Sequence, residues 1–519
     1  MKPTKNYFFQ SFAIVVISIA ALIGFKQVLP SKIFTETATA TKNVVVDSLM
    51  LEAVQEEAVK QKDSVAPEEK IVKEDKQKVF FQPEEGIAFP PETYSNYKGF
   101  QYLMPFYQKL VQLEKSGEGN VRIAYFGDSM TDGDLIVKDL RAALQARFGG
   151  QGVGFVNITS ESAASRSTLT HQFSNNWKTQ SYLNVKHPEK PFGVSGYVFF
   201  TKHDTLNPVW VKYKSVKFNN ISQLNDPVLF YGHSENTTAS VHYITGNDTV
   251  IKKLNPVNRL NTLRLGNSAT SFRAEFFAAD SIPLYGFNFD DGRGVHVDNF
   301  SNRGNSGLPI SILNKPLMKA FNEKLGYDLI ILHYGTNVLN YGTYDYYWYE
   351  KKMGVVVNHL KECFPGVSIL IISTADKSTK YGTEMQTDSA VVPLTRAQKR
   401  YALNNKAGYI NLYMLMGGNG SMVKWADTIP ALANKDYTHF NYRGAKKVAG
   451  IIYNELNKGY EDYKKLGGDK VVVKLPKDTI RKNGLPKDTV RKKGVNKDTL
   501  HKNIPYNPPK KDSLHANTN

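Results

Sequence analysis

The spacing of apolar residues predicts a strand, a tight turn and a helix in succession near the start of the folded region. Apolar side chains recur at helical intervals over residues 100–113. A continuous apolar strand is predicted over 121–126, and it leads into a turn at 127–133. A helix-like pattern follows over 135–148. We therefore expect folding to begin near residue 93 with a helix and a strand–turn–helix unit.

A different pattern occupies residues 158–290. Short runs such as 197–200 and 209–213 alternate apolar with polar side chains, and Asn, Asp, Gly and Ser separate them. No convincing long helix interrupts these runs. Period-two alternation between polar turns is typical of half-buried strands. The pattern predicts an all-β module of the sandwich or jelly-roll type.

Helix and strand alternate again after residue 292. Strands are predicted at 295–299, 328–334 and 367–373, and helices at 313–325, 346–363 and 394–406. Continuous apolar strands between helices are typical of a parallel sheet that is buried on both faces. The β module is therefore expected to interrupt an α/β domain. We assign residues 93–157 and 292–465 to the α/β domain and 158–291 to the inserted β domain.

The first 92 residues lack the features of a folded domain. Residues 6–25 carry no charged side chain, and twenty residues in a helix reach about 30 Å, enough to span a bilayer. We interpret residues 1–30 as a membrane anchor with everything after it exported, and a cleaved signal peptide is the alternative. Residues 31–92 are rich in Glu, Lys, Gln, Val and Ala, and are predicted to be a stalk.

The net charge of +18 belongs largely to the C-terminal region. Residues 470–519 hold 13 Lys or Arg and 4 Asp, a net charge of +9. A repeat of period ten begins at 475, recurs at 485 and fades at 495. We predict that residues 466–519 form a disordered basic tail. It either solubilises the protein or binds an anionic surface such as a cell-wall polymer. Because half of the net charge lies in this tail and not on the folded part, no nucleic-acid partner is predicted.

Metal and disulfide chemistry have little support. Cys363 is the single cysteine, so an internal disulfide is excluded, and no Cys/His cluster has metal-ligand spacing. Asp128, Asp132 and Asp134 gather in one turn without a histidine, which favours turn and helix-capping roles over a metal site. No metal or cofactor is therefore predicted. His296 and His333 lie in or beside strands and are expected to be structural.

Four polar motifs carry candidate chemistry. Ser129 lies in the turn after the first strand, the loop 302–307 follows the second, and Asn337 follows the third. Asp436 and His439 precede the last helix-like segment. In open α/β sheets ligands bind at the carboxyl ends of the strands, where these motifs are expected. Serine, histidine and carboxylate supply a nucleophile, its base and a group that orients the base.

These motifs, in this order, resemble the SGNH branch of the GDSL hydrolase family over roughly residues 118–157 and 292–458. The resemblance implies a flavodoxin-like three-layer fold and ester hydrolysis through an acyl-serine. It assigns Ser129 as the nucleophile, His439 as the base and Asp436 as the residue that orients the base.

The resemblance also implies an oxyanion hole. Its hydrogen-bond donors would be the backbone N–H of Ser129, a glycine N–H and the side chain of Asn337. Gly307 is our preferred glycine because it closes the Asn-x-Gly-x-x-Gly string, and Gly304 is the fallback. Each such donor typically stabilises the transition state by roughly 3–4 kcal/mol.

A finer resemblance comes from the inserted β module and the glycine-rich string at 148–155. Both are similar to bacterial peptidoglycan O-acetylesterases, in which a domain like a carbohydrate-binding module interrupts the SGNH domain. The resemblance implies an exported, membrane-anchored esterase whose substrate and partner is an acetylated cell-envelope glycan, with its catalytic domain in the periplasm or outside. Four aromatic residues of the β module form either a sugar-stacking surface or its core: Trp177, Trp210, Tyr213 and Tyr243.

Two other functions are compatible with the same residues. An O-acetyltransferase would use the same triad but pass the acyl group to a sugar hydroxyl instead of water. A glycan-binding protein with an idle hydrolase domain would need none of the chemistry, and the intact Ser, Asn and Asp-x-x-His argue against it.

Overall fold

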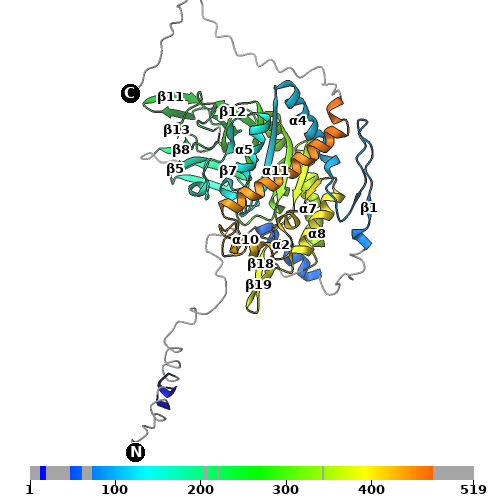
Figure 1. The fold of residues 1–519 in the computed structure, drawn as a ribbon. Helices are drawn as coiled ribbons and strands as arrows, with labels where there is room; N and C mark the ends of the chain where they lie inside the picture. The colour runs from blue at the N-terminus through cyan, green and yellow to red at the C-terminus, as the bar shows by residue number, and fades with distance from the viewer. Residues whose placement is uncertain are drawn as a thin grey trace, which may run out of the picture. The chain divides into compact units, whose positions relative to one another are not determined.

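The computed structural model describes residues 12–13, 15–18, 47–60, 73–202, 208–219, 221–339, 341 and 344–471. In this part of the chain a parallel sheet flanked by helices lies beside two antiparallel sheets (Figure 1).

Five parallel strands form the central sheet. Their order in space is β15 (Gly294–Asn299), β3 (Asn120–Gly127), β16 (Tyr327–His333), β17 (Ser368–Ile372) and β20 (Gly408–Ile410). Numbered by their appearance in the chain, these strands run 2-1-3-4-5, which is the flavodoxin-like order. The first strand therefore lies at the point where the direction of strand addition reverses, and ligands bind at such points. The predicted α/β fold with a parallel sheet is confirmed.

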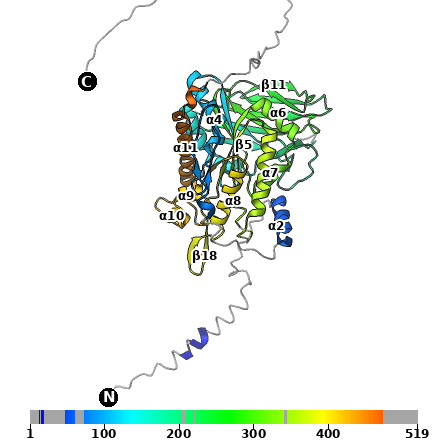
Figure 2. The ribbon, with the colours of Figure 1, turned by 90° about the vertical axis from the view of Figure 1, so that its right-hand side faces the viewer.

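Helices cover both faces of this sheet and make three layers. One face packs against α4 (Met104–Ser116), α5 (Val137–Phe148) and α11 (Tyr442–Lys465), and the other against α6 (Lys315–Leu325), α7 (Tyr347–Cys363) and α8 (Val391–Asn404). Figure 2 shows α4 and α11 on one side and α6 and α7 on the other. Within β16, Ile330 and Leu332 join one core while Leu329 and Ile331 join the other. Burial on both faces explains why the strand is apolar throughout.

Shorter elements complete the α/β part. They are η1 (Phe100–Leu103), η2 (Asp132–Asp134), η4 (Leu308–Ile312), the hairpin β18 (Ser378–Tyr381) and β19 (Glu384–Thr387), α9 (Leu412–Met416), α10 (Ser421–Asp427) and η5 (Gly468–Lys470).

The inserted domain is built from two antiparallel sheets that share a core. One runs β11 (Asp248–Lys253), β10 (Ser240–Thr245), β13 (Ser271–Phe277), β8 (Val209–Ser215) and β5 (Leu169–Phe173). The other runs β12 (Leu260–Arg264), β9 (Val228–Gly232), β14 (Leu284–Asp290), β7 (Tyr197–Thr201) and β6 (Trp177–Ser181), and β4 (Gly152–Val156) also pairs with β14. The short helix η3 (Ala163–Ser165) precedes β5. Strand β4, which we assigned to the α/β domain, thus belongs to the second antiparallel sheet.

Most of the aromatic side chains considered as a sugar-stacking surface belong to the sandwich core. Trp177, Tyr213 and Tyr243 are buried among the residues shared by the two sheets. Trp210 is half-buried, and the Arg273 guanidinium covers its ring at 4.2 Å. Three of the four rings therefore belong to the sandwich core, and Trp210 alone is partly exposed.

A buried charge network joins the sandwich to the parallel sheet. Arg122 of β3 donates to both carboxylate oxygens of Asp298 of β15, at 2.9 and 2.8 Å, and also pairs with Asp290 of β14. Tyr327 donates its hydroxyl to Asp298 at 2.7 Å. Burial alone would raise the pKa of Asp290, but the Arg122 charge outweighs it and lowers that pKa to about 2. Removing one partner of such a network leaves buried charge unpaired.

Part of the predicted stalk packs onto the folded domain. Within residues 31–92, helix α2 (Ser48–Lys60) buries Met50 and Ala53 in the core on the α7 side of the sheet. The strands β1 (Lys78–Val79) and β2 (Glu92–Thr93) form a two-stranded sheet. The stalk prediction is therefore wrong for these segments. Met50 and Ala53 are buried against the folded domain, and the composition of the region did not indicate this.

The remaining terminal predictions fall almost wholly outside the described residues. Of the predicted anchor, only residues 12–13 and 15–18 are described, and they are helical. Among the described residues, no helix has the length and apolar character required to cross a membrane. The repeat-containing tail from residue 472 onward also lies outside them.

Candidate active site

The first predicted motif forms a tight turn at the carboxyl end of the central strand. Strand β3 ends at Gly127, where a Cβ atom would overlap the side chain of Thr131. The next residue, Asp128, is buried and accepts a hydrogen bond from the Met130 N–H at 2.9 Å through its own carboxylate. These contacts hold Ser129 half-buried at the sheet edge.

Ser129, His439 and Asp436 form one line of hydrogen bonds. The Ser129 Oγ lies 2.9 Å from His439 Nε2, although 310 positions separate the two residues. On the far side of the ring, His439 Nδ1 lies 2.8 Å from Asp436 Oδ2. The other carboxylate oxygen of Asp436 accepts the backbone N–H groups of Thr438 and His439 at 3.0 and 2.9 Å. This arrangement is that of a nucleophile, a base and a residue that orients the base.

The protonation of the pair follows from these contacts. Partial burial would raise the pKa of Asp436, but the hydrogen bonds from the His439 ring and from the two backbone N–H groups outweigh it and lower the pKa to about 2. The ionised carboxylate keeps the proton of a neutral His439 on Nδ1, which leaves the Nε2 lone pair facing the Ser129 hydroxyl. His439 and Asp436 are 38% and 48% exposed, so water reaches this site.

Asp128 connects the serine turn to the Asn337 motif. It hydrogen-bonds both the side chain and the backbone of Thr336, which precedes Asn337. Burial raises the pKa of Asp128 to about 6, against the lowering effect of its hydrogen bonds and of nearby His439. Asp128 therefore fixes the serine turn and the loop that carries Asn337 relative to each other.

Two of the predicted oxyanion donors have an N–H without an acceptor in the described part of the chain. The backbone N–H of Ser129 makes no hydrogen bond within the described residues. The Asn337 side-chain amide donates one N–H to the carbonyl of Asn305 at 3.0 Å, and its second N–H is available to a ligand. The Asn305 loop runs beside the serine turn, since Asn302 donates its N–H to the Gly127 carbonyl at 3.0 Å.

The two candidate glycines differ in the partners of their N–H groups. The Gly307 N–H already donates to Asn305 Oδ1 at 2.8 Å, and the residue is buried with a φ of 93°. Gly304 is half-buried, and its N–H has no partner in the described structure. Gly307 instead shapes the loop, because a Cβ there would press on the Tyr334 ring at 2.8 Å. Of the two glycines, Gly304 is therefore the one whose N–H remains open to a ligand.

Three residues that the sequence analysis missed hold this loop. The buried Asp47 carboxylate accepts the Ser306 N–H at 3.0 Å and also bonds the Ser306 hydroxyl. Tyr182 of the sandwich accepts a hydrogen bond from the Asn305 amide at 3.0 Å, and Tyr349 of α7 donates to the Ser306 carbonyl at 2.7 Å. Asp47 does carry a local signal, since it caps α2 through a 3.0 Å bond from the Met50 N–H.

The other acidic residues and histidines have structural partners. Asp134 is buried against Arg141 at 2.9 Å, and Asp132 pairs with Arg303 at 2.8 Å. The Nδ1 atom of buried His333 shares a 2.7 Å hydrogen bond with the Tyr125 hydroxyl. Burial lowers the pKa of His333 to about 3. Buried His296 faces Asp291 at 3.7 Å. Within the described residues no group of His, Cys, Asp or Glu is arranged to hold a metal ion.

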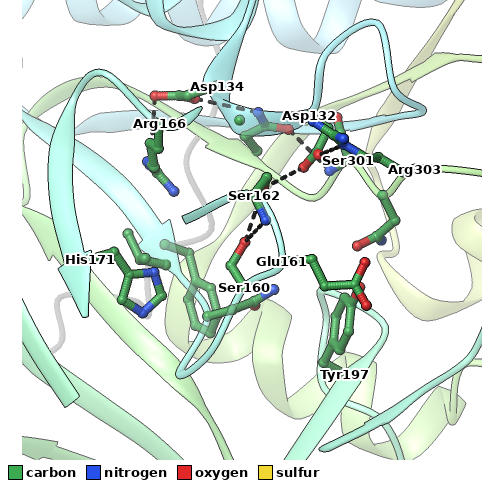
Figure 3. A pocket seen from close by; sticks show the side chains of 16 residues that line it. Asp132, Asp134, Ser160, Glu161, Ser162, Arg166, His171, Tyr197, Ser301 and Arg303 are labelled. Carbon is green, nitrogen blue, oxygen red and sulfur yellow. Dashed lines mark hydrogen bonds and ion pairs between the residues drawn. The ribbon is translucent and has the colours of Figure 1, made fainter. Parts of the chain in front are cut away.

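A polar pocket adjoins the site, at the junction of the sandwich and the α/β domain (Figure 3). Its cavity volume is about 60 Å³. The walls come from the serine turn and the loop 299–303 on one side, and from residues 155–171 and Tyr197 of β7 on the other. Arg303, on its rim, immediately precedes Gly304.

Comparisons with known proteins place the fold. No protein-family model matches the sequence, and no curated protein matches it significantly. A solved peptidoglycan O-acetylesterase is similar in structure, with a TM-score of 0.56 and 22% identity over 69% of this chain and 96% of that protein. A family two carbohydrate esterase from Cellvibrio japonicus aligns with a TM-score of 0.24 and 10% identity, over 56% of this chain and 99% of that protein.

Of these two, only the first has a TM-score above 0.5. At 22% identity it establishes a shared fold. The chain therefore has the fold of a peptidoglycan O-acetylesterase, as the sequence motifs predicted.

Proposed function

We propose that the protein is a serine esterase that removes O-acetyl groups from a cell-envelope polysaccharide, with peptidoglycan as the first candidate substrate. The observation that carries the proposal is the hydrogen-bonded line from Ser129 through His439 to Asp436, at 2.9 and 2.8 Å. It lies at the carboxyl edge of a sheet with the fold of an O-acetylesterase, which supports the same class of reaction.

The proposed reaction has two acyl-transfer steps. In the first, the Ser129 Oγ attacks the acetyl carbonyl carbon while its proton passes to His439 Nε2. The oxyanion receives hydrogen bonds from the Ser129 N–H, the Gly304 N–H and the Asn337 amide. The C–O bond to the sugar then breaks, and the sugar oxygen takes the proton from His439, which leaves an acetyl-serine.

Water completes the cycle in the second step. His439 removes a proton from a water molecule as the water oxygen attacks the acetyl carbon. The Ser129 ester bond breaks, Ser129 regains the proton from His439, and acetate leaves. The exposure of His439 and Asp436 supports water as the acceptor over a sugar hydroxyl, because a transferase must exclude water from its acyl-enzyme.

The proposal includes a location. An uncleaved helix over residues 6–25 would anchor the protein in the cell membrane with the catalytic domain in the periplasm or outside, and the basic tail would bind an anionic cell-wall polymer. The apolar run and the +9 charge of residues 470–519 support these assignments. Membrane fractionation and alkaline extraction of the full chain test the anchor; release without detergent would contradict it.

Acetate release tests the activity. The full chain should release acetate from O-acetylated peptidoglycan and from an acetylated aryl ester, and Ser129→Ala should abolish both without changing the melting temperature. Ser311→Ala, which removes a hydroxyl far from the triad in sequence and bonded only to the Leu308 carbonyl, is the matched control. Activity that survives in Ser129→Ala would overturn the triad assignment, and acetyl transfer to chito-oligosaccharide in place of acetate release would favour a transferase.

A further inference from the structure

The pocket beside the triad contains an arginine whose charge is only partly compensated. Arg166 lines the pocket with its side chain 12% exposed, and its Nη2 lies 3.6 Å from Asp134 Oδ2. The Asp134 carboxylate is already occupied by Arg141, which donates to both of its oxygens at 2.9 and 3.1 Å. One carboxylate therefore serves two guanidinium groups, and Arg141 holds the nearer position.

The remaining contacts of Arg166 are to neutral groups. Its Nε donates to Thr168 Oγ1 at 3.1 Å, and its Nη2 donates to the Val153 carbonyl at 3.5 Å. Its Nη1 makes no hydrogen bond within the described residues. Burial and the Arg141 charge lower the pKa of Arg166, against the opposing effect of Asp134. An anion beside Nη1 would therefore meet a positive charge that the protein leaves partly unpaired.

The other charges of the pocket do not cancel this one. Figure 3 shows Arg166 and His171 on one side of the pocket, with Arg303 and Glu161 on the opposite side. Burial lowers the pKa of His171 to about 4, so its ring is neutral at pH 7. Asp132 pairs with Arg303 at 2.8 Å. Glu161 is exposed, so water and salt screen its charge. The inner end of the pocket is therefore the positive end.

The size of the cavity limits what can occupy it. Its volume is about 60 Å³. A water molecule needs roughly 10–15 Å³ on this measure, so the cavity holds roughly four to six water-sized groups. A methyl group joined to a carboxylate has this size, whereas a sugar ring or an aromatic acid exceeds it. The lining also includes two apolar residues, Phe155 and Val156.

A chain of contacts leads from the pocket to the oxyanion loop. Ser162 donates its hydroxyl to Asp132 Oδ1 at 2.7 Å, and Asp132 Oδ2 lies 2.8 Å from Arg303 Nε. Arg303 immediately precedes Gly304, whose N–H remains open to a ligand. A carboxylate bound in the pocket adds negative charge beside the pair of Asp132 and Arg303. It therefore acts on the position of the Gly304 N–H.

We propose that this pocket binds a small monocarboxylate, with acetate as its ligand, and that the bound anion slows the reaction. The choice of acetate rests on the proposed function, which releases acetate next to the pocket. Arg166 holds the carboxylate through Nη1. None of Ser129, His439 and Asp436 lines the pocket, so this is a second site for the product, separate from the triad.

Binding of acetate to the full chain carrying Ser129→Ala tests the site. Sodium acetate should raise the melting temperature above its value in sodium chloride of equal ionic strength. Titration of methyl-labelled acetate followed by NMR gives the Kd, and adding Arg166→Met should weaken binding at least about tenfold. Asp134 keeps its bonds to Arg141 in this variant, so the fold should persist. Acetate binding that is unchanged in Arg166→Met would overturn the site.

Two further variants separate charge from structure. Arg166→Lys keeps the positive charge and should retain most of the binding. Arg264→Met removes an arginine that pairs with Asp226 at 2.9 Å outside the pocket, and it is the matched control that should bind acetate like the parent chain. Loss of binding in Arg264→Met equal to that in Arg166→Met would show a general effect of charge and overturn the assignment to Arg166.

Other anions test the identity of the ligand. Benzoate should bind at least about tenfold more weakly than acetate because its ring exceeds the cavity. Inorganic phosphate should also bind more weakly, since its second negative charge meets only one partly unpaired guanidinium. Phosphate binding as tight as that of acetate, and dependent on Arg166, would overturn the choice of a monocarboxylate.

Kinetics on p-nitrophenyl acetate separate the two acetate sites. Acetate that returns to the triad competes with the ester and raises KM, whereas acetate in the pocket lowers kcat. The wild-type chain should show both effects, and Arg166→Met should show only the rise in KM. A wild-type kcat that acetate does not lower would overturn the inhibition. If acetate binding depends on Arg166 but no ester is hydrolysed, the esterase proposal fails and the carboxylate site stands.

Discussion

Asp47 accepts a 3.0 Å hydrogen bond from the backbone N–H of Ser306, 259 positions away in the chain. Its other carboxylate oxygen caps α2 by accepting the Met50 N–H at 3.0 Å. Ser306 follows Asn305, whose carbonyl holds the Asn337 amide at 3.0 Å. The segment before the folded domain is therefore attached to the loop that builds the oxyanion site.

Replacing Asp47 by Ala should lower both stability and kcat. The loss leaves the buried N–H of Ser306 unsatisfied and uncaps α2, which costs about 1–3 kcal/mol in the free energy of unfolding. Because the loop then positions Asn337 less well, kcat should fall while KM for a small ester changes little. Asp47→Asn, which retains an acceptor oxygen, should recover part of the activity. Equal kcat in wild type and Asp47→Ala would show that the contact serves stability alone.

Ionisation of Asp128 should make stability depend on pH. Its pKa is about 6 in the folded protein, above the ordinary aspartic acid value of 3.8, so the folded state binds the proton more tightly than the unfolded chain does. Below about pH 3.8 the raised pKa of Asp128 contributes its full stabilisation of the folded state. The free energy of unfolding then falls by roughly 3 kcal/mol as the pH rises through 6. Asp128→Asn, which keeps an acceptor for the Met130 N–H, should lose this dependence. Denaturation with urea at pH 5 and pH 8 checks it, and parallel pH profiles for both proteins would contradict the assignment.

Asn337→Ala should slow catalysis without unfolding the protein. Removing one oxyanion donor typically costs about 10²–10³-fold in kcat. KM should change little, since the donor acts on charge that develops in the transition state. Gly307→Ala provides a contrast, because a Cβ at its positive φ presses on Tyr334 and should lower the melting temperature. Steady-state kinetics on an acetylated aryl ester measure the first effect, and a fall in kcat below threefold would remove Asn337 from the oxyanion hole.

The Arg122 network should be essential for joining the two domains. Arg122→Leu leaves Asp298 and Asp290 buried without their cation, which should lower the free energy of unfolding by about 3–5 kcal/mol. Lys178→Ala removes an exposed pair with Glu189 and should cost under about 1 kcal/mol. Denaturant unfolding of both variants makes the comparison. Similar losses in the two variants would mean that the buried network contributes no more than a surface pair.

The local patterns of the chain were sufficient for the elements and for the order of the motifs. The helix expected at 346–363 is α7 (Tyr347–Cys363), and the apolar strand at 121–126 is the core of β3 (Asn120–Gly127). Both predictions succeeded because the burial of an amphipathic helix, or of a strand covered on both faces, is visible in the local pattern of apolar residues. The parallel sheet and the inserted antiparallel strands followed from the change in period along the chain.

Contacts between distant segments could not be predicted in this way. The motif favoured Gly307 over Gly304, and only the folded loop shows that the Gly307 N–H is already bonded to Asn305. The segment around Asp47 has the composition of a linker, yet Met50 and Ala53 are buried because the surface of another part of the chain receives them.

By itself, the sequence determined the layered α/β architecture, the inserted β domain and the residue types available for acyl transfer, because hydrophobic period and motif order are local properties. Tertiary structure alone decided that Ser129, His439 and Asp436 meet at hydrogen-bond distance, that Gly304 rather than Gly307 has a free N–H, and that Glu161 and Tyr197 face a pocket beside them. Those relationships depend on strand order and loop packing over some three hundred residues, which no local pattern records.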